Sequence, residues 1–286
     1  MSEMTRTSSL ALRKRAEQRY RRLLDTIFSR VDASIIGLTS IAEINRKLIA
    51  IANSPQFNDL CVEAARQMAT MLAVGQKSTW LIAARSSSRG RAIQRALMQE
   101  TTNTAIGQSI SNIVAQNAQL IKTVPQDMAH KFAKLAQQRQ FEGVRPDDIT
   151  KEILEEAKHL EEYEARRIAR TESAKASTAL VQAKAEALDL DFYIWRTARD
   201  GERVRDSHQI MEDVICRWSD PPNPERLAGE PKSYGNYHPG GIFNCRCIAL
   251  VIIALEDIKF PAKVHISGSI VKINSLKDFK ARFGIT

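Results

Sequence analysis

The stretch "GNYHPGGIFNCRCIALVI", residues 235–252, joins a glycine-rich loop to an apolar run. It holds His238 and two of the chain's four cysteines, Cys245 and Cys247, which are separated by a single residue. The apolar run that follows is rich in β-branched residues and predicts a buried strand that closes the fold. Four scattered cysteines are too few for a disulfide framework, so we expect a protein made and kept in a reducing cytoplasm.

Cys245 and Cys247 have three interpretations. With His208 and His238 they supply the nitrogen and sulfur ligands that a tetrahedral structural zinc site requires, and Cys216 is a substitute ligand. Alternation along a strand equally predicts two small buried side chains on one face. The third interpretation is a catalytic thiol beside a histidine. A disulfide between the two is not expected, because a strand splays residues i and i+2 apart.

Residues 1–187 carry apolar side chains at helical spacing and predict a long, mainly α-helical N-terminal part. Gly75 predicts the end of one helix, and Pro125 predicts a break and a restart in another. The start of the chain is basic but has no apolar core of a secretory signal. No apolar run approaches the roughly 20 residues that cross a membrane, so no membrane partner is expected.

The pattern changes at Asp189. "DFYIWRTARD" predicts a strand, Asp200-Gly201 a turn, and "RDSHQIMEDVI" a short helix that starts at Asp206. A loop rich in Pro, Gly and Asn then leads into the closing strand. After Pro261 the chain predicts a hairpin around Gly268 and a short basic helix. So small a segment is hard to hold by its core alone, and a zinc ion would stabilise it.

The predicted fold class is therefore α+β. A helical region, residues 1–164, precedes a small α+β domain, residues 165–260, with the hairpin and short helix of residues 261–286 as a tail.

Charged residues cluster in two neighbouring segments of the predicted α+β domain. "ARRIARTESAKAS" lies on a long helix, and "WRTARDGERVRDSH" forms the strand, turn and short helix. Dense charge beside an aromatic strand favours a structural network of arginine–carboxylate pairs. Its members are Arg170, Glu172, Asp200, Arg203, Arg205 and Asp206. Within it, we expect Glu172 to contact Arg203 or Arg205. The alternative is an active site in which Asp206 and His208 handle a metal or a proton.

The formal net charge of +9 and the pI near 9.5 favour acidic partners, and nucleic acid is the first candidate. DNA binding is expected to be nonspecific and to use basic helices. The same cations could instead dock on an acidic protein surface. The candidate residues are Arg13, Lys14, Arg15, Arg19, Arg21, Arg22, Arg85, Arg89, Arg91 and Arg95.

Several linked motifs over residues 165–252 resemble the phage Mu F-like minor head proteins, also called phage head morphogenesis proteins. They are Arg170-Thr171-Glu172, Trp195, the turn from Asp200 to His208, and Asn244 to Cys247. The resemblance implies a low-copy virion component that assembles in the host cytoplasm. It would act in procapsid assembly near the portal, with portal, capsid or scaffold proteins as partners and an association with packaged double-stranded DNA.

The resemblance carries no catalytic role, and we expect a structural protein with zinc as its one candidate cofactor. The competing hypothesis is an enzyme carried in the phage head. A metal-dependent nuclease would use Asp206, His208, His238 and Asn244, whereas a transferase would use the Arg-Thr-Glu helix.

Overall fold

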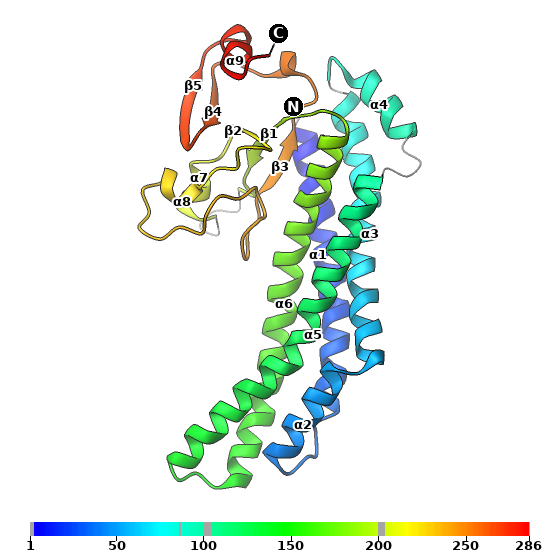
Figure 1. The fold of residues 1–286 in the computed structure, drawn as a ribbon, viewed down its shortest axis with the longest axis vertical. Helices are drawn as coiled ribbons and strands as arrows, with labels where there is room; N and C mark the ends of the chain where they lie inside the picture. Colours follow the sequence, from blue (N-terminus) through cyan, green and yellow to red (C-terminus); the bar gives the residue numbers. More distant parts are fainter. Residues whose placement is uncertain (1–2, 86, 100–103, 200–203, 286) are drawn as a thin grey trace. The chain divides into compact units, whose positions relative to one another are not determined.

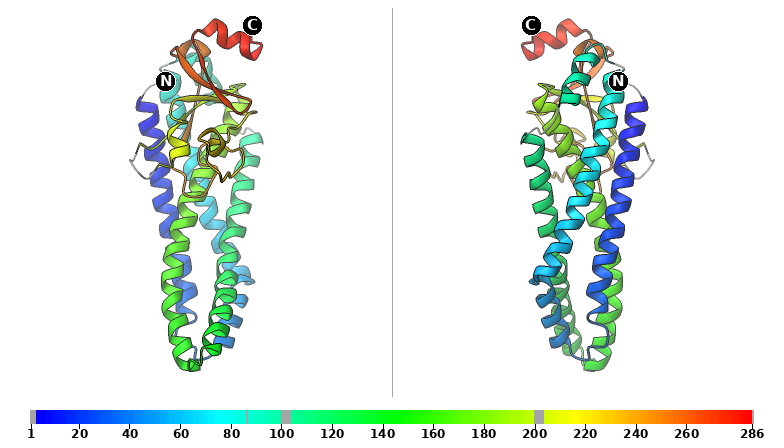
Figure 2. Two further views of the ribbon diagram at one scale, coloured as in Figure 1. Left: turned by 90° about the vertical axis from the view of Figure 1, so that its left-hand side faces the viewer. Right: turned by 90° about the vertical axis from the view of Figure 1, so that its right-hand side faces the viewer.

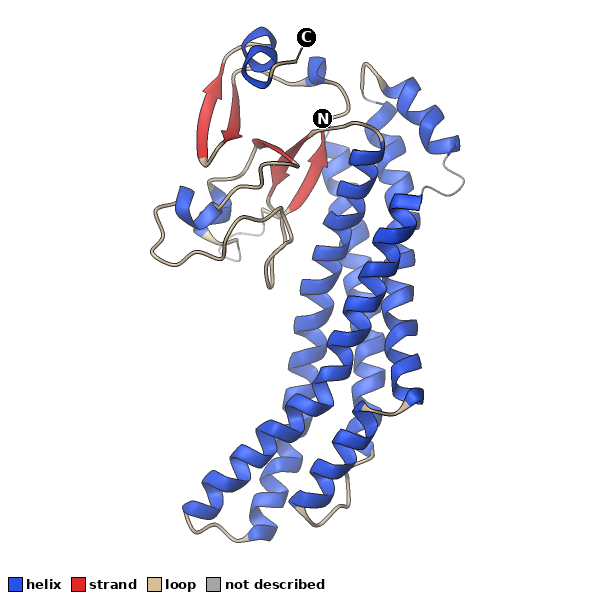
Figure 3. Cartoon of the chain, viewed as in Figure 1, coloured by secondary structure: helices blue, strands red, loops and turns tan. Residues whose placement is uncertain are grey.

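The computed structural model describes residues 3–85, 87–99, 104–199 and 204–285. Helices fill the described chain up to Ala187, and short strands follow (Figure 1). The helices are α1 Glu3–Ala33, α2 Ile41–Ala52, α3 Pro55–Arg85, α4 Gly90–Gln99, α5 Thr104–Phe141 and α6 Pro146–Ala187. Figure 3 shows the same division by secondary structure. The predicted α+β class, with a long helical part before a small sheet region, is confirmed. No described helix is long and apolar enough to cross a membrane.

Two predicted helix breaks are wrong. Gly75 lies inside α3, where an added Cβ would overlap the side chain of Leu12. Glycine therefore allows α1 to pack closely on α3 and does not end the helix. Pro125 lies inside α5, flanked by Val124 and Met128, which are 4% and 1% exposed. Packing of both neighbours in the core outweighs the helix-breaking tendency of proline.

The strands form one five-stranded sheet in the order β3-β1-β2-β4-β5. They are β1 Phe192–Arg196, β2 Val214–Arg217, β3 Ile248–Val251, β4 Ala262–Ile266 and β5 Ser269–Ile273. The β2–β4 pair is parallel, and the other pairs are antiparallel. Between and after the strands lie α7 Asp206–Gln209, α8 Pro224–Leu227, the 3-10 turn η2 Leu255–Asp257 and α9 Leu276–Phe283. The predicted hairpin is β4–β5, with Gly268 in the left-handed region at φ 82°.

The sheet buries both faces because side chains alternate along β1. Tyr193 and Trp195 enter one core with Trp80 of α3 and the two cysteines Cys245 and Cys247. Phe192 enters the other core, where its ring centroid lies 5.0 Å from that of Phe279 in α9. Both views of Figure 2 show α9 beside the β4–β5 hairpin.

The chain packs as two compact units that do not follow sequence order. Unit 1 comprises the described residues of Met1–Ala16, Thr70–Ile110 and Ser173–Thr286, and unit 2 comprises Glu17–Ala69 and Ser111–Glu172. These limits differ from the predicted boundaries at residues 164 and 260, because the start of α1 and the end of α3 pack with the sheet region in unit 1.

Unit 2 contains a buried carboxylate. Glu161 of α6 is 7% exposed, and its Oε1 has no hydrogen-bond partner among the described residues. Burial raises the pKa of Glu161 to about 8, and the nearby Asp32 carboxylate adds to the shift. The pKa of Asp32 is itself raised by burial, which Lys158 opposes. Glu161 is therefore protonated in the native state at neutral pH.

Replacement of Glu161 by Gln should stabilise the protein at high pH. Between about pH 4.5 and pH 8 the native state keeps a proton that the unfolded chain releases, so stability falls as pH rises. We expect Glu161→Gln to raise the free energy of unfolding at pH 8, on the order of 3 kcal/mol, and to change little at pH 4. Thermal melts of the full chain, with the exposed Glu155→Gln as control, measure this. Equal gains at both pH values would contradict it.

Candidate metal centre

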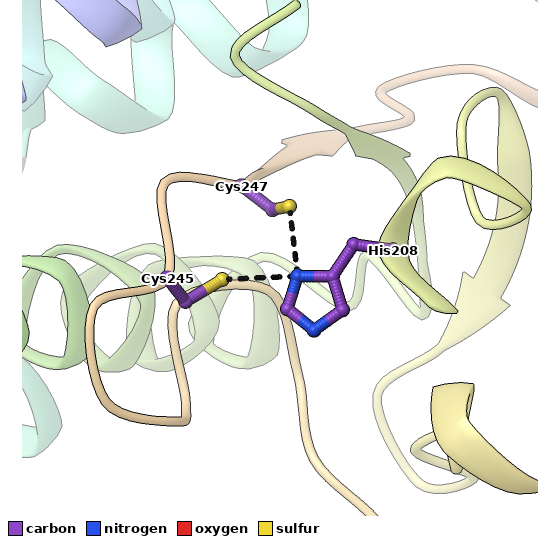
Figure 4. Close-up of side chains that lie close together, drawn as sticks. All are labelled: His208, Cys245 and Cys247. Atoms are coloured by element: carbon purple, nitrogen blue, oxygen red, sulfur yellow. Dashed lines mark hydrogen bonds between the residues drawn. The ribbon is translucent and has the colours of Figure 1, made fainter. Parts of the chain in front are cut away.

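Three residues of the predicted ligand set come together (Figure 4). His208 Nδ1 lies 3.6 Å from Cys245 Sγ and 3.4 Å from Cys247 Sγ. Each of the three residues is only 2% exposed. Their candidate ligand atoms all lie within 4.8 Å of one another, and no fourth His, Cys, Asp or Glu of the described chain joins the group.

The spacing of these atoms fits a tetrahedral metal ion. Zinc bonds of about 2.3 Å to sulfur and 2.0 Å to nitrogen place neighbouring ligand atoms roughly 3.6 Å apart in a tetrahedron. Both measured nitrogen–sulfur distances, 3.6 and 3.4 Å, agree with that value. Two thiols and an imidazole are also the donors that zinc prefers. The three residues therefore fit a zinc ion and leave one tetrahedral position open.

The two cysteines lie before the strand and not on it. β3 begins at Ile248, and Cys245 is held in a turn by the hydrogen bond from its backbone N–H to the Ile242 carbonyl oxygen, 3.3 Å. Asn244 adopts a left-handed backbone at φ 55°, which breaks the strand geometry. The interpretation of Cys245 and Cys247 as neighbours on a strand face is therefore wrong. The turn brings both sulfur atoms to His208.

The glycine-rich loop is clamped onto α6 beside the cysteines. Thr178 donates a hydrogen bond of 2.5 Å from its hydroxyl to the Pro239 carbonyl oxygen. Gly240 has φ 83°, and a Cβ there would lie 2.9 Å from the Ala174 carbonyl oxygen. Only glycine fits without strain. This close approach lets the Gly240 N–H donate to Cys245 Sγ at 3.2 Å, a contact that stabilises a thiolate.

Arg13 of α1 holds the backbone on which the cysteines lie. Its guanidinium donates to the carbonyl oxygen of Cys247 at 2.6 Å and to that of Arg246. Arg13 is 6% exposed. Its predicted role as a contact for nucleic acid is therefore wrong, because the side chain is buried against these carbonyl groups and cannot reach a phosphate.

The two sulfur atoms differ in acidity. A hydrogen bond with Cys247 holds the pKa of Cys245 well below its ordinary value, against the effect of burial. The hydrogen bond with Cys245 raises the pKa of Cys247, and burial adds to that shift. A metal ion that binds both sulfur atoms as thiolates must displace the protons that they carry.

His238 and Cys216 lie with other partners. The Nδ1 atom of His238 is 3.0 Å from the hydroxyl of Tyr193, and burial lowers the pKa of His238 to about 4. Cys216 lies on β2 with its thiol 3.8 Å from the Val214 carbonyl oxygen. Neither belongs to the group of three, so the predicted four-ligand set is present only in part.

Several described members of the predicted charge network have other contacts. Arg205 donates to the Phe243 carbonyl oxygen at 3.0 Å and lies 4.7 Å from the centroid of the Phe243 ring. The contact of Glu172 with Arg203 or Arg205 stays a prediction. Arg170 pairs with Glu17 at 3.2 Å. Glu172 contributes, after burial, to a raised pKa of Tyr20. Asp206 is exposed and accepts a hydrogen bond from Gln209. Asp200 and Arg203 lie outside the described residues.

Glu212, which the sequence analysis missed, is the centre of a charge network in unit 1. It accepts from the Thr197 backbone N–H at 2.6 Å and from Arg199 at 2.9 Å, and it pairs with Arg6 at 3.6 Å. Burial disfavours its ionisation, but these donors outweigh burial and lower the pKa of Glu212. Arg6 also donates to the Thr197 carbonyl oxygen at 2.8 Å. The acidic residues that follow the short helix "DSHQ" were the sequence feature that could have indicated this network.

The remaining predicted cationic residues lie at the surface to different degrees. Arg21 is half-buried and pairs with Asp25 and Glu162, both at distances of 3.5–3.6 Å. The others are exposed: Lys14, Arg15, Arg19, Arg22, Arg85, Arg89, Arg91 and Arg95. These eight side chains can reach an acidic partner.

The chain matches the family described as "Phage Mu protein F like protein" over residues 90–250, more than half of its length. It belongs to that family. The matched region contains His208, Cys245 and Cys247. The coarse function that this family suggests is phage head morphogenesis.

An uncharacterized protein of Haemophilus influenzae is 30% identical to the chain over 148 residues. The match covers 52% of this chain and 30% of the relative, so the chain spans less than a third of that protein. No solved structure matches.

Proposed function

We propose that this Mu F-like chain is a minor head protein that acts in procapsid assembly next to the portal. The observation that carries the proposal is the family match across residues 90–250. The burial of His208, Cys245 and Cys247 supports a structural role for their centre. Two cavities are described in unit 1, the larger of about 420 Å³, and neither is lined by these three residues. If the three residues formed an enzyme site, a substrate would need a cavity that reaches them.

Interruption of the gene in a phage or prophage genome that carries it tests this role. We expect few DNA-filled heads without the protein and recovery when the wild-type chain is supplied in trans. Virions should hold only a few copies, which cross-link to the portal protein because both lie at one vertex. Electron microscopy and quantitative mass spectrometry of purified particles measure both. Normal heads without the protein, or copies in proportion to the major capsid protein, would contradict the proposal.

The metal of the centre is zinc in this proposal, with a structural role. Sulfur and imidazole donors at tetrahedral spacing favour zinc over the hard cations, which prefer oxygen. His208, Cys245 and Cys247 would hold it. The fourth position is left for water or for a donor from a partner protein. Zinc would tie the turn before β3 to α7 and would stabilise the small sheet region.

Metal analysis of the purified full chain tests the zinc centre. We expect about one zinc per chain. Paired substitution of Cys245→Ser and Cys247→Ser should remove it and lower the melting temperature. Cys216→Ala changes a buried cysteine of the same core outside the group, so it should keep the metal. Equal zinc content in the paired variant and the wild type would eliminate the centre.

The exposed cations give the chain a nonspecific association with packaged DNA, or with an acidic surface of the portal or scaffold. Lys14, Arg15, Arg19 and Arg22 lie on α1. Arg85, Arg89, Arg91 and Arg95 lie at the end of α3, in the α3–α4 connection and on α4. Phosphate contacts by six or more of them would release condensed counterions, so the affinity would depend steeply on salt.

Titration of duplex DNA onto the full chain tests the association. Affinity should fall roughly 10³-fold or more between about 50 and 200 mM salt. Reversal to Glu at Arg85, Arg89, Arg91 and Arg95 should weaken binding and reduce the salt slope. The control reverses four exposed cations elsewhere, namely Lys263, Lys272, Lys277 and Arg282. The DNA interaction would be contradicted by salt-independent binding, or by equal losses in the two variants. Loss of portal cross-links with DNA affinity intact would assign the arginines to a protein surface.

The nuclease hypothesis gains no support from the described geometry of its histidines and Asp206. His208 faces two sulfur atoms, and His238 contacts Tyr193. Asp206 is exposed beside Gln209. Cleavage of plasmid DNA by the wild type with added divalent metal, and not by His208→Ala, would overturn the structural proposal.

A further inference from the structure

A fully buried carboxylate lies in the proline-rich loop between β2 and β3. Glu225 is 0% exposed although its loop is polar. α8 positions it: Asn223 accepts the Arg226 backbone N–H at 3.2 Å as N-cap, and Pro224 occupies the first turn. Burial of an acidic group is unfavourable unless that group serves as a hydrogen-bond acceptor. Glu225 therefore needs a specific partner.

That partner is Tyr237, which connects Glu225 to His208. The Tyr237 hydroxyl donates to Glu225 Oε1, and the same hydroxyl lies 2.9 Å from His208 Nε2. The tyrosine hydroxyl carries one hydrogen, which it donates in the bond with Glu225. The phenolic oxygen is then left to accept a hydrogen bond from the Nε2–H of His208. This direction corresponds to the tautomer of His208 with its hydrogen on Nε2.

This tautomer leaves the lone pair of Nδ1 free on the side of the two sulfur atoms. Nδ1 is the atom that lies 3.6 and 3.4 Å from Cys245 Sγ and Cys247 Sγ. The hydrogen-bond chain thus selects the one tautomer that can bind a metal between imidazole and thiolates. The Trp195 ring, with its centroid 5.5 Å from that of His208, packs edge-on against the imidazole and limits its rotation.

We propose that Tyr237 and Glu225 are positioning residues of a zinc centre formed by His208, Cys245 and Cys247. The inference rests on the proposed zinc centre and adds the residues that set its affinity. A partner on the distal nitrogen of a metal-bound histidine fixes the ring and increases its donor strength, and its loss typically weakens metal binding 10- to 100-fold. The loop of residues 219–241 carries both positioning residues, and it brings the Glu225 carboxylate and the Tyr237 phenol to the Nε2 side of His208.

The chain contains a matched control. Tyr193 and His238 form a second tyrosine–histidine pair, part-buried, with the hydroxyl 3.0 Å from Nδ1. His238 is not in the ligand group, so removal of the Tyr193 hydroxyl also removes a hydrogen bond to an imidazole but leaves the centre unchanged.

Zinc affinity of the full chain tests the proposal by competition with a chromophoric chelator. Tyr237→Phe and Glu225→Gln should each lower the affinity about 10- to 100-fold, and Tyr193→Phe by less than about threefold. The double variant Tyr237→Phe/Glu225→Gln should lose little more than Tyr237→Phe alone, because Glu225 acts through Tyr237. With cobalt as the probe, the thiolate-to-metal absorption should persist in Tyr237→Phe, which shows that both cysteines still bind.

Several outcomes separate this inference from the zinc centre itself. Wild-type affinity in Tyr237→Phe, measured on a chain that binds zinc, would overturn the positioning role and leave the centre intact. An equal loss in Tyr193→Phe would overturn it too, since the effect would be general destabilisation. A wild-type chain without zinc affinity would overturn both. Tyr237→Phe removes only one oxygen atom. If Glu225→Gln does not fold, the zinc affinity of Tyr237→Phe alone therefore tests the positioning role.

Discussion

The guanidinium of Arg13 connects the beginning of the chain to the segment that carries the candidate ligands. Its donors reach the carbonyl oxygens of Arg246 and Cys247, more than 230 residues along the chain. Carbonyl groups in a turn have no strand partner, and buried ones need a donor. Arg13 supplies it, while the Gly240 N–H reaches Cys245 Sγ. With both contacts in place, the turn before β3 holds two sulfur atoms near one imidazole.

The contact of Arg13 with the turn before β3 joins segments of unit 1 that are distant in the sequence. The parts of this unit come from the start of α1, the end of α3 and everything after Ser173. Such a unit has no local core of its own until distant segments meet, so its folding depends on contacts of large sequence separation. Arg6, about two turns before Arg13 on the same face of α1, contacts Thr197 and Glu212. A metal ion would add a further cross-link inside the same unit. The apolar core of that unit is divided into two clusters, one on each face of a short sheet.

Local patterns in the sequence predicted much of this. The aromatic β1, the helix at Asp206 and the hairpin at Gly268 each carry a local signature, and all are present. β2 was missed because Val214–Arg217 follows a helical pattern without a turn residue of Gly or Pro.

The metal group was found from residue types alone, but His238 was misassigned, since spacing cannot show which imidazole faces the sulfur atoms. Arg13, Tyr237 and Glu225 could not be found, because their partners lie on other elements and no local pattern marks a buried charge. The same reason explains why Arg13 looked like one more surface cation.

The central claim is that one zinc ion binds His208, Cys245 and Cys247. X-ray absorption at the zinc edge of the zinc-loaded full chain tests it most directly. We expect a coordination shell with two sulfur atoms at about 2.3 Å, one imidazole nitrogen at about 2.0 Å and one further light atom. A shell built only of nitrogen and oxygen, unchanged by Cys245→Ser and Cys247→Ser, would contradict it.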